Sequence, residues 1–160
     1  MNRRQFVVAT SASLLAPSLL AHHGWSSFDE AKPLYFVGTV KSLKWQNPHA
    51  ELVIEVAKDA TLPADLAKRA VPKQTQNVDG AKVMANAALP KHRGEWTLEL
   101  SPLTRIDAWK VAQPKVGDKV AAVGYTFKDE KMHDGKHISR IEYFIVGDSI
   151  YGLRSMPDAG

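Results

Sequence analysis

Five short segments rich in β-branched and aromatic residues, several with alternating apolar and polar positions, constrain the fold of this chain most. Turn-forming Gly, Pro, Asn or Asp residues bound most of them, so each segment predicts a β-strand. The segments cover residues 34–47, 51–56, 95–100, 119–127 and 137–145. Ser101, as the N-cap, and Pro102 are expected to begin one short amphipathic helix between the third and fourth strands.

This order predicts a mainly β fold, a small five-stranded OB-like barrel with one short helix between strands three and four. Closing the sheet into a barrel removes the edges that an open sheet leaves exposed. Gly38 and Gly124 lie inside the first and fourth strands, where a lone glycine indicates a bulge or a sharp bend. An open five-stranded sheet covered by the helix is the alternative.

Residues 57–93 interrupt the strand pattern with prolines and few large apolar side chains. They predict a surface insertion, partly mobile, with short helical pieces near residues 64–70 and 81–88. The barrel domain is expected to span residues 22–147, and residues 148–160 to form a polar, loosely held tail. A length of 160 residues agrees with one such domain.

Residues 1–21 are predicted to be a cleavable export signal. The segment Arg3-Arg4-Gln5-Phe6-Val7 resembles the twin-arginine export motif. The apolar run that follows is shorter and more polar than the roughly 20 apolar residues of a membrane span, so no span is expected after processing. Cleavage after Ala21 would release a periplasmic protein that begins with His22. A general secretory signal that happens to carry two arginines is the alternative.

The composition limits the chemistry available to the exported chain. The absence of cysteine excludes disulfides, thiolate ligands and cysteine nucleophiles. The formal charge is +4, and it falls by two when Arg3 and Arg4 leave with the signal. Such a nearly balanced charge, without runs of Lys and Arg between aromatic residues, argues against a nucleic-acid partner.

Several short motifs occur in an order that is typical of one protein family. They are His22-His23, Gly38-Thr39-Val40, Trp45-Gln46-Asn47-Pro48-His49, Trp96-Thr97-Leu98-Glu99 and Gly117-Asp118-Lys119-Val120. Together they resemble a family of small exported bacterial proteins of unknown function. The resemblance covers most of residues 22–145 outside the insertion. It implies an OB-like barrel in the periplasm and supplies no biochemical activity.

The mature N-terminus is the candidate metal site. The free amine and Nδ1 of His22 can chelate one metal ion, and a second imidazole would complete a histidine brace, which favours Cu(II). His49 is the candidate for that imidazole, and His23 is a less favoured alternative. The sequence therefore predicts a periplasmic metal-binding protein, with copper as the first choice of metal and a periplasmic protein as a further candidate partner.

Two other classes of protein remain as alternatives. One is a metal-free binding or accessory module that presents its barrel face to a protein or a small ligand. The other is an enzyme, which ranks last and would require that the brace copper is redox-active and open to substrate, because the residues show no catalytic constellation. Ser26, Ser27 and Asp29 have the residue types of a hydrolase triad, yet no nucleophile elbow surrounds them.

Three further histidines are weaker candidates. His133 and His137 flank the Asp134-Gly135 turn, and a two-residue hairpin is expected to direct them to opposite faces. Met132 is expected to oppose His137, a combination that suits Cu(I), although an exposed hairpin tip is the commoner explanation. His92, between Lys91 and Arg93, is expected to be solvated.

Overall fold

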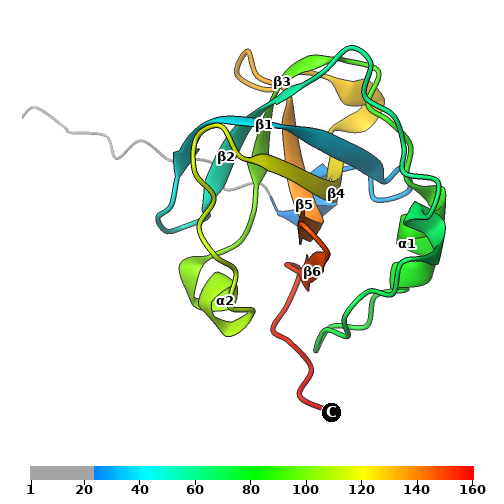
Figure 1. Cartoon of the computed structure of the whole chain (residues 1–160), viewed down its shortest axis with the longest axis vertical. Helices are drawn as coiled ribbons and strands as arrows, with labels where there is room; N and C mark the ends of the chain where they lie inside the picture. The colour runs from blue at the N-terminus through cyan, green and yellow to red at the C-terminus, as the bar shows by residue number, and fades with distance from the viewer. Residues whose placement is uncertain (1–23) are drawn as a thin grey trace, which may run out of the picture.

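The computed structural model describes residues 24–160 and contains a closed five-stranded barrel (Figure 1). Its strands follow the order β3-β2-β1-β4-β5, and a parallel pairing between β3 and β5 closes the sheet. The bounds are β1 Leu34–Lys44, β2 Glu51–Val56, β3 Gly94–Glu99, β4 Lys119–Thr126 and β5 Ile138–Val146. This arrangement confirms the OB-like barrel and excludes the open sheet.

The core of the barrel is built from the alternating positions that the sequence pattern predicts. Leu52, Ile54, Trp96 and Leu98 have no exposed surface, and Trp96 packs against the ring of Phe36 at a centroid distance of 4.8 Å. Helix α2 (Leu103–Ala108) lies at one end of the barrel (Figure 1) and inserts its buried residue Ile106 into the same core. Burial of such side chains stabilises each by roughly 1.5–3 kcal/mol.

Helix α2 begins differently from the sequence prediction. Pro102 occupies the N-cap position with an extended backbone, so Ser101 lies one residue too early to cap the helix. The Ser101 hydroxyl is buried and has no hydrogen-bond partner among residues 24–160. Asn47 supplies the cap instead, since its Oδ1 accepts a hydrogen bond from the backbone amide of Leu103 at 3.0 Å.

The strands bend at two irregularities. One lies in the β4–β5 pairing between Val123 and Gly124, as the sequence indicates. A Cβ atom on Gly124 would lie 2.4 Å from the Arg140 carbonyl oxygen, so only glycine permits this approach. The other lies in β1 between Val40 and Ser42, so the expected bend near Gly38 is displaced along the strand.

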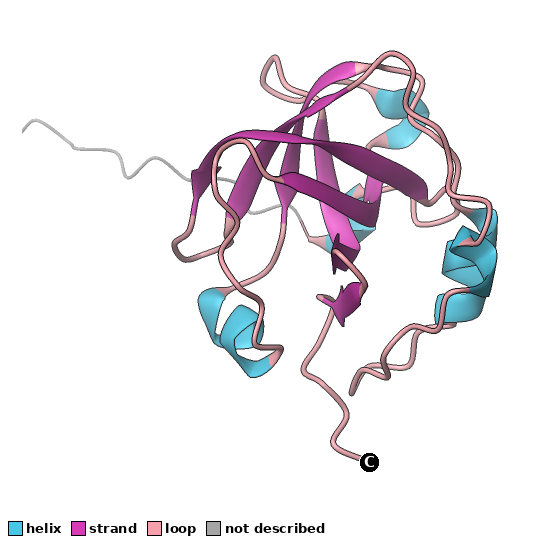
Figure 2. Ribbon diagram, viewed as in Figure 1, coloured by secondary structure: helices cyan, strands magenta, loops and turns pink. Residues whose placement is uncertain are grey.

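The insertion at residues 57–93 covers the outside of the barrel. It contains a 3-10 turn at Leu66–Lys68 and helix α1 (Gly80–Asn86), which confirms the two helical pieces (Figure 2). Some of its apolar side chains are buried against the outer faces of β1, β4 and β5, as Leu66 at 3% and Met84 at 1% exposure show. They contact a second apolar cluster that includes Tyr35 and Tyr143.

The C-terminal segment is ordered by pairing rather than loosely held. Strand β6 (Ser149–Gly152) adds to β5 in antiparallel register, and Leu153 is fully buried in the barrel core. The expectation of a loosely held tail is therefore wrong for these residues, because the apolar side chains between the polar ones find contacts on the barrel. The part of the chain described has no helix with the length and apolar character needed to cross a membrane.

Candidate functional site

The predicted metal ligands fall on two parts of the chain. His22 and His23 lie outside the described residues, while His49 is half-buried in the connection between β1 and β2. Within residues 24–160, no three histidine or carboxylate side chains are arranged to hold a metal ion. A metal centre at His49 therefore depends on ligands that precede residue 24.

The Asn47-Pro48-His49 corner is fixed on both sides by backbone contacts. The Asn47-Pro48 peptide bond is cis, and the Asn47 side chain caps α2 through Leu103. Directly after His49, the amide of Ala50 donates to the Ser101 carbonyl at 3.1 Å, and the Ala50 carbonyl accepts from Leu100 at 2.8 Å. The backbone that carries His49 is thereby held against the end of β3.

The described chain begins with an arm, residues 24–33, that packs onto the outside of β4 and β5. The Trp25 ring lies 3.9 Å below the Arg154 guanidinium and meets Tyr125 edge-on at 6.2 Å. Phe28 is buried and stacks on Phe127 at 4.9 Å. The aromatic residues of the arm therefore pack on the barrel and do not form an open binding platform.

A buried charged network holds the arm in place. The Glu142 carboxylate, on β5, has no exposed surface, and it accepts hydrogen bonds from Arg154 Nε at 2.6 Å and from Gln74 Nε2 at 3.0 Å. Arg154 also pairs with Glu30 of the arm. The network therefore joins the arm, the insertion, β5 and the C-terminal segment, and each charge has an opposite partner.

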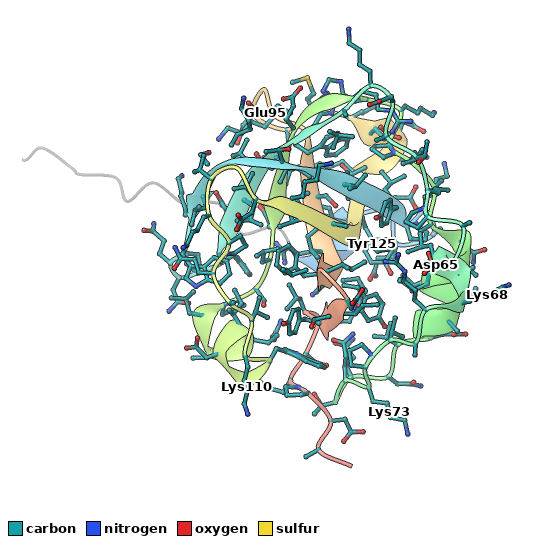
Figure 3. All side chains as sticks on the ribbon, viewed as in Figure 1. Asp65, Lys68, Lys73, Glu95, Lys110 and Tyr125 are labelled. Carbon is teal, nitrogen blue, oxygen red and sulfur yellow. The ribbon has the colours of Figure 1, made fainter. Side chains whose placement is uncertain are left out.

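Burial dominates the proton affinities in this network. It raises the pKa of Glu142, and the charge of Arg154 and the hydrogen bond from Gln74 oppose that rise. Burial also raises the pKa of Tyr125, and the nearby charge of Glu142 adds to the effect. Tyr125 (labelled in Figure 3) is therefore a neutral phenol at physiological pH, suited to packing rather than to proton transfer.

A strip of polar side chains leads from the arm toward His49. Arg140 of β5 lies 5.6 Å from the Trp25 ring and donates two hydrogen bonds to the Glu99 carboxylate, at 2.9 and 2.7 Å. Glu99 of β3 lies directly opposite Glu51 of β2. His49 precedes Glu51 by two residues, so the strip crosses β5, β3 and β2 and ends beside the corner.

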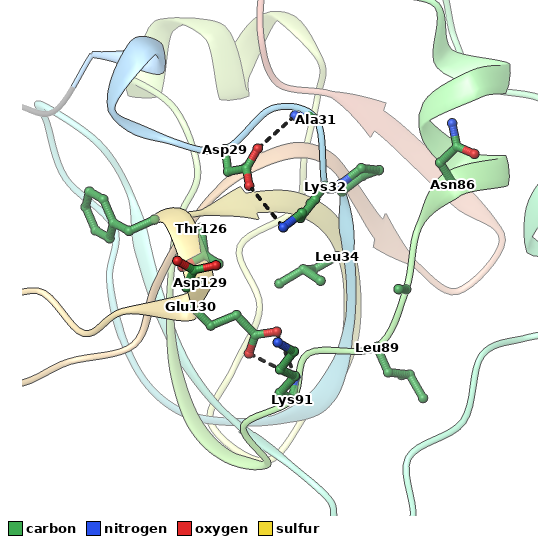
Figure 4. Close-up of a pocket in the computed structure, with 13 residues that line it drawn as sticks. Asp29, Ala31, Lys32, Leu34, Asn86, Leu89, Lys91, Thr126, Asp129 and Glu130 are labelled. Atoms are coloured by element: carbon green, nitrogen blue, oxygen red, sulfur yellow. Dashed lines mark hydrogen bonds and ion pairs between the residues drawn. The ribbon is translucent and has the colours of Figure 1, made fainter.

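A separate pocket of about 340 Å³ lies between the arm, the end of the insertion and the end of β4 (Figure 4). Leu34, Leu89 and Phe127 line its apolar walls. Asp129 and Glu130 stand at its edge, where both Glu130 oxygens accept from the Lys91 amide at 2.9 Å. Its volume and apolar walls suit a small molecule with an apolar body.

The hairpin histidines are arranged partly as expected. His133 pairs with Lys136 across a turn in which Asp134 and Gly135 have positive φ, and it does not face the same pocket as His137. The expectation for His92 is wrong, because its ring is half-buried and stacks on His137 at a centroid distance of 3.8 Å. The stack forms because the end of the insertion runs beside the start of β5.

The charged network and the His92–His137 stack are the features that sequence reasoning missed. Arg140 and Glu142 are the two charged residues of a strand that is otherwise apolar except for Ser139, and charges in such a position indicate buried partners. That signal could have identified the network. The stack carries no comparable signal, since His92 and His137 are far apart in the sequence.

The fold and the arm together define the class of protein, a small closed OB-like barrel with an N-terminal arm fixed to its outer face. Residues 10–67 match the model of a family of unknown function (DUF6152), and this match confirms the resemblance to such a family over the arm, β1, β2 and the start of the insertion. No curated protein and no solved structure matches the chain.

Proposed function

We propose that this chain is a periplasmic copper-binding protein whose site is built on its mature N-terminus. After cleavage behind Ala21, the amine and Nδ1 of His22 would form a chelate with Cu(II), and His49 would add a second imidazole. His23 remains a spare ligand. Copper is the first choice because two imidazoles and an amine form the nitrogen-rich equatorial plane that Cu(II) prefers.

The observation that carries this proposal is the fixed position of Trp25. The Trp25 ring lies against Arg154 and Arg140 on the outside of β5, so the residue three positions after His22 has a defined place on the barrel. Two strand spacings, about 10 Å, separate β5 from β2, and three extended residues span about 10 Å. Three extended residues can therefore cross the two strand spacings between β5 and β2, which supports a contact between His22 and the corner that carries His49.

The decisive experiment is a Cu(II) titration of the protein with its native N-terminus. One added residue before His22 removes the free amine from the chelate position and is expected to weaken Cu(II) binding by roughly 100-fold, and His49→Ala by roughly tenfold or more. His133→Ala, a histidine on the far hairpin, is the matched control. Unchanged affinity in the extended protein and in His49→Ala contradicts the proposal.

A metal-free binding module is the second candidate, and the 340 Å³ pocket of Figure 4 is the observation that favours it. Its apolar walls suit a small ligand with an apolar body, and the charged side chains of Lys32 and Asp129 in its lining offer polar contacts of both signs. The N-terminal extension separates the two candidates. It abolishes a histidine brace and leaves a ligand in this pocket unaffected, because the pocket begins at Asp29.

A further inference from the structure

We propose a second, independent metal site between the β4–β5 hairpin and the start of β3, in which His92, His137 and Met132 bind Cu(I). The three side chains line one pocket of about 250 Å³. His92 comes from the end of the insertion, His137 immediately precedes β5, and Met132 lies in the hairpin that joins β4 to β5. This site shares no residue with the proposed N-terminal site, so an experiment can contradict one proposal and leave the other intact.

The backbone of His92 is fixed from both sides while its ring is not. The His92 amide donates to Glu130 Oε2 at 3.2 Å, and its carbonyl accepts from Trp96 Nε1 at 3.1 Å. Among the described residues, the ring itself makes stacking contacts and no hydrogen bond. The structure therefore positions the imidazole and leaves its nitrogens available for a metal.

His137 has an unsatisfied nitrogen. Its Nδ1 is buried and has no hydrogen-bond partner within residues 24–160. Nearly all buried polar atoms in proteins have a partner, and an ion or a water is a common one when no protein group is present. The His137 backbone is held as well, since its carbonyl accepts from the Thr97 amide at 2.8 Å.

The stacked rings need one small movement before they bind the same ion. Their planes differ by 17°, so the nitrogen lone pairs run nearly parallel and do not converge. A turn of His92 about χ2 brings a nitrogen toward the pocket, and this torsion is broad for histidine. Gly94 lies beside the ring and has no side chain to obstruct the turn, whereas a Cβ atom there would lie 3.4 Å from His92 Nε2.

The thioether of Met132 determines which metal ion the proposed site prefers. Its side chain is 55% exposed at the hairpin, where an apolar thioether gains little from burial, and it lines the pocket with the two imidazoles. A thioether is a soft ligand that selects Cu(I) over hard cations. Glu95, beside the hairpin in Figure 3, lines the same pocket. No three histidine or carboxylate side chains within residues 24–160 are arranged to hold a metal ion, so the third ligand is the thioether and not this carboxylate.

The test uses the full mature chain with His22→Ala and His23→Ala, which removes the N-terminal site. Cu(I) is supplied under anaerobic conditions against a coloured Cu(I) chelator, and Zn²⁺ is titrated separately. The protein with only His22→Ala and His23→Ala is expected to bind one equivalent of Cu(I). Adding His92→Ala or His137→Ala should weaken that binding by roughly tenfold to 100-fold, and Met132→Leu by about tenfold.

His133→Ala is the matched control, because it lies on the same hairpin and outside the pocket. Thermal unfolding of each variant shows whether it folds, and His92→Gln replaces any variant that does not. NMR of the His92 and His137 ring protons should shift on addition of Ag(I), a diamagnetic substitute for Cu(I). Unchanged Cu(I) affinity in both histidine variants, or tight Zn²⁺ binding without Cu(I) binding, overturns the proposal.

Discussion

Asn47 Oδ1 lies 3.0 Å from the backbone nitrogen of Leu103, so a side chain from the β1–β2 corner caps helix α2 at one end of the barrel. Removing such a cap costs about 1 kcal/mol. Asn47→Ala is therefore expected to lower the free energy of unfolding by that amount in urea denaturation. Asn47→Asp retains the acceptor oxygen and should remain close to the parent protein. An Asn47→Ala protein as stable as the parent contradicts this structural role.

The ion pair between Arg154 and Glu142 is expected to be among the most costly to break. Arg154→Met leaves a buried carboxylate without its cation, which destabilises a protein by roughly 3–5 kcal/mol. Chemical denaturation followed by tryptophan fluorescence measures this, and Trp25 should also become more exposed to a quencher. Arg69→Met is the matched control, since its partner Asp65 is 65% exposed and such a pair contributes about 0.5 kcal/mol. Equal losses in the two variants would refute the prediction.

The insertion is expected to contribute to stability despite its few apolar residues. Met84→Ala opens a cavity against the barrel and should cost about 2–5 kcal/mol in the free energy of unfolding. Leu62→Ala, in the same insertion but 40% exposed, should cost well under half as much. Differential scanning calorimetry of both variants is the measurement. A negligible loss in Met84→Ala would mean that the insertion does not pack in solution.

The His92–His137 stack predicts a pH dependence of stability. Burial and the neighbouring His92 lower the pKa of His137 below its ordinary value of 6.5, while the Glu130 carboxylate opposes them. The unfolded chain therefore binds the proton more readily than the folded one. The neutral His137 ring therefore contributes to the free energy of unfolding above pH 6.5. This contribution is lost as the pH falls through the lower pKa that His137 has in the folded protein.

Urea denaturation at several pH values, with a chelator to remove metal, tests this prediction. The parent protein should lose stability between pH 7 and pH 5, and His137→Gln should lose less over the same interval. The same two proteins compared at about pH 8, where a histidine of ordinary pKa is neutral, give the reference difference. A steeper loss of the free energy of unfolding in His137→Gln would contradict a lowered pKa of His137 in the folded protein.

The sequence determined the elements of the barrel and their order. Buried residues such as Leu52, Ile54, Trp96 and Leu98 occupy every second position. This alternation predicts a β-strand with one buried face and indicates which side chains point into the core. The Asp134-Gly135 hairpin was equally predictable, because both residues favour the positive φ that its turn needs. Local patterns of this kind depend on neighbours within a few residues.

Tertiary structure decided everything that joins distant parts of the chain. Arg154 and Glu30 form a pair over 124 residues, His92 stacks on His137 across the start of β3, and Asn47 rather than Ser101 caps α2. Strand β6 likewise forms because β5 offers an edge, not because its own pattern is strong. The order of the strands predicts that the barrel closes, but local patterns do not specify which side chains from remote segments meet when it does.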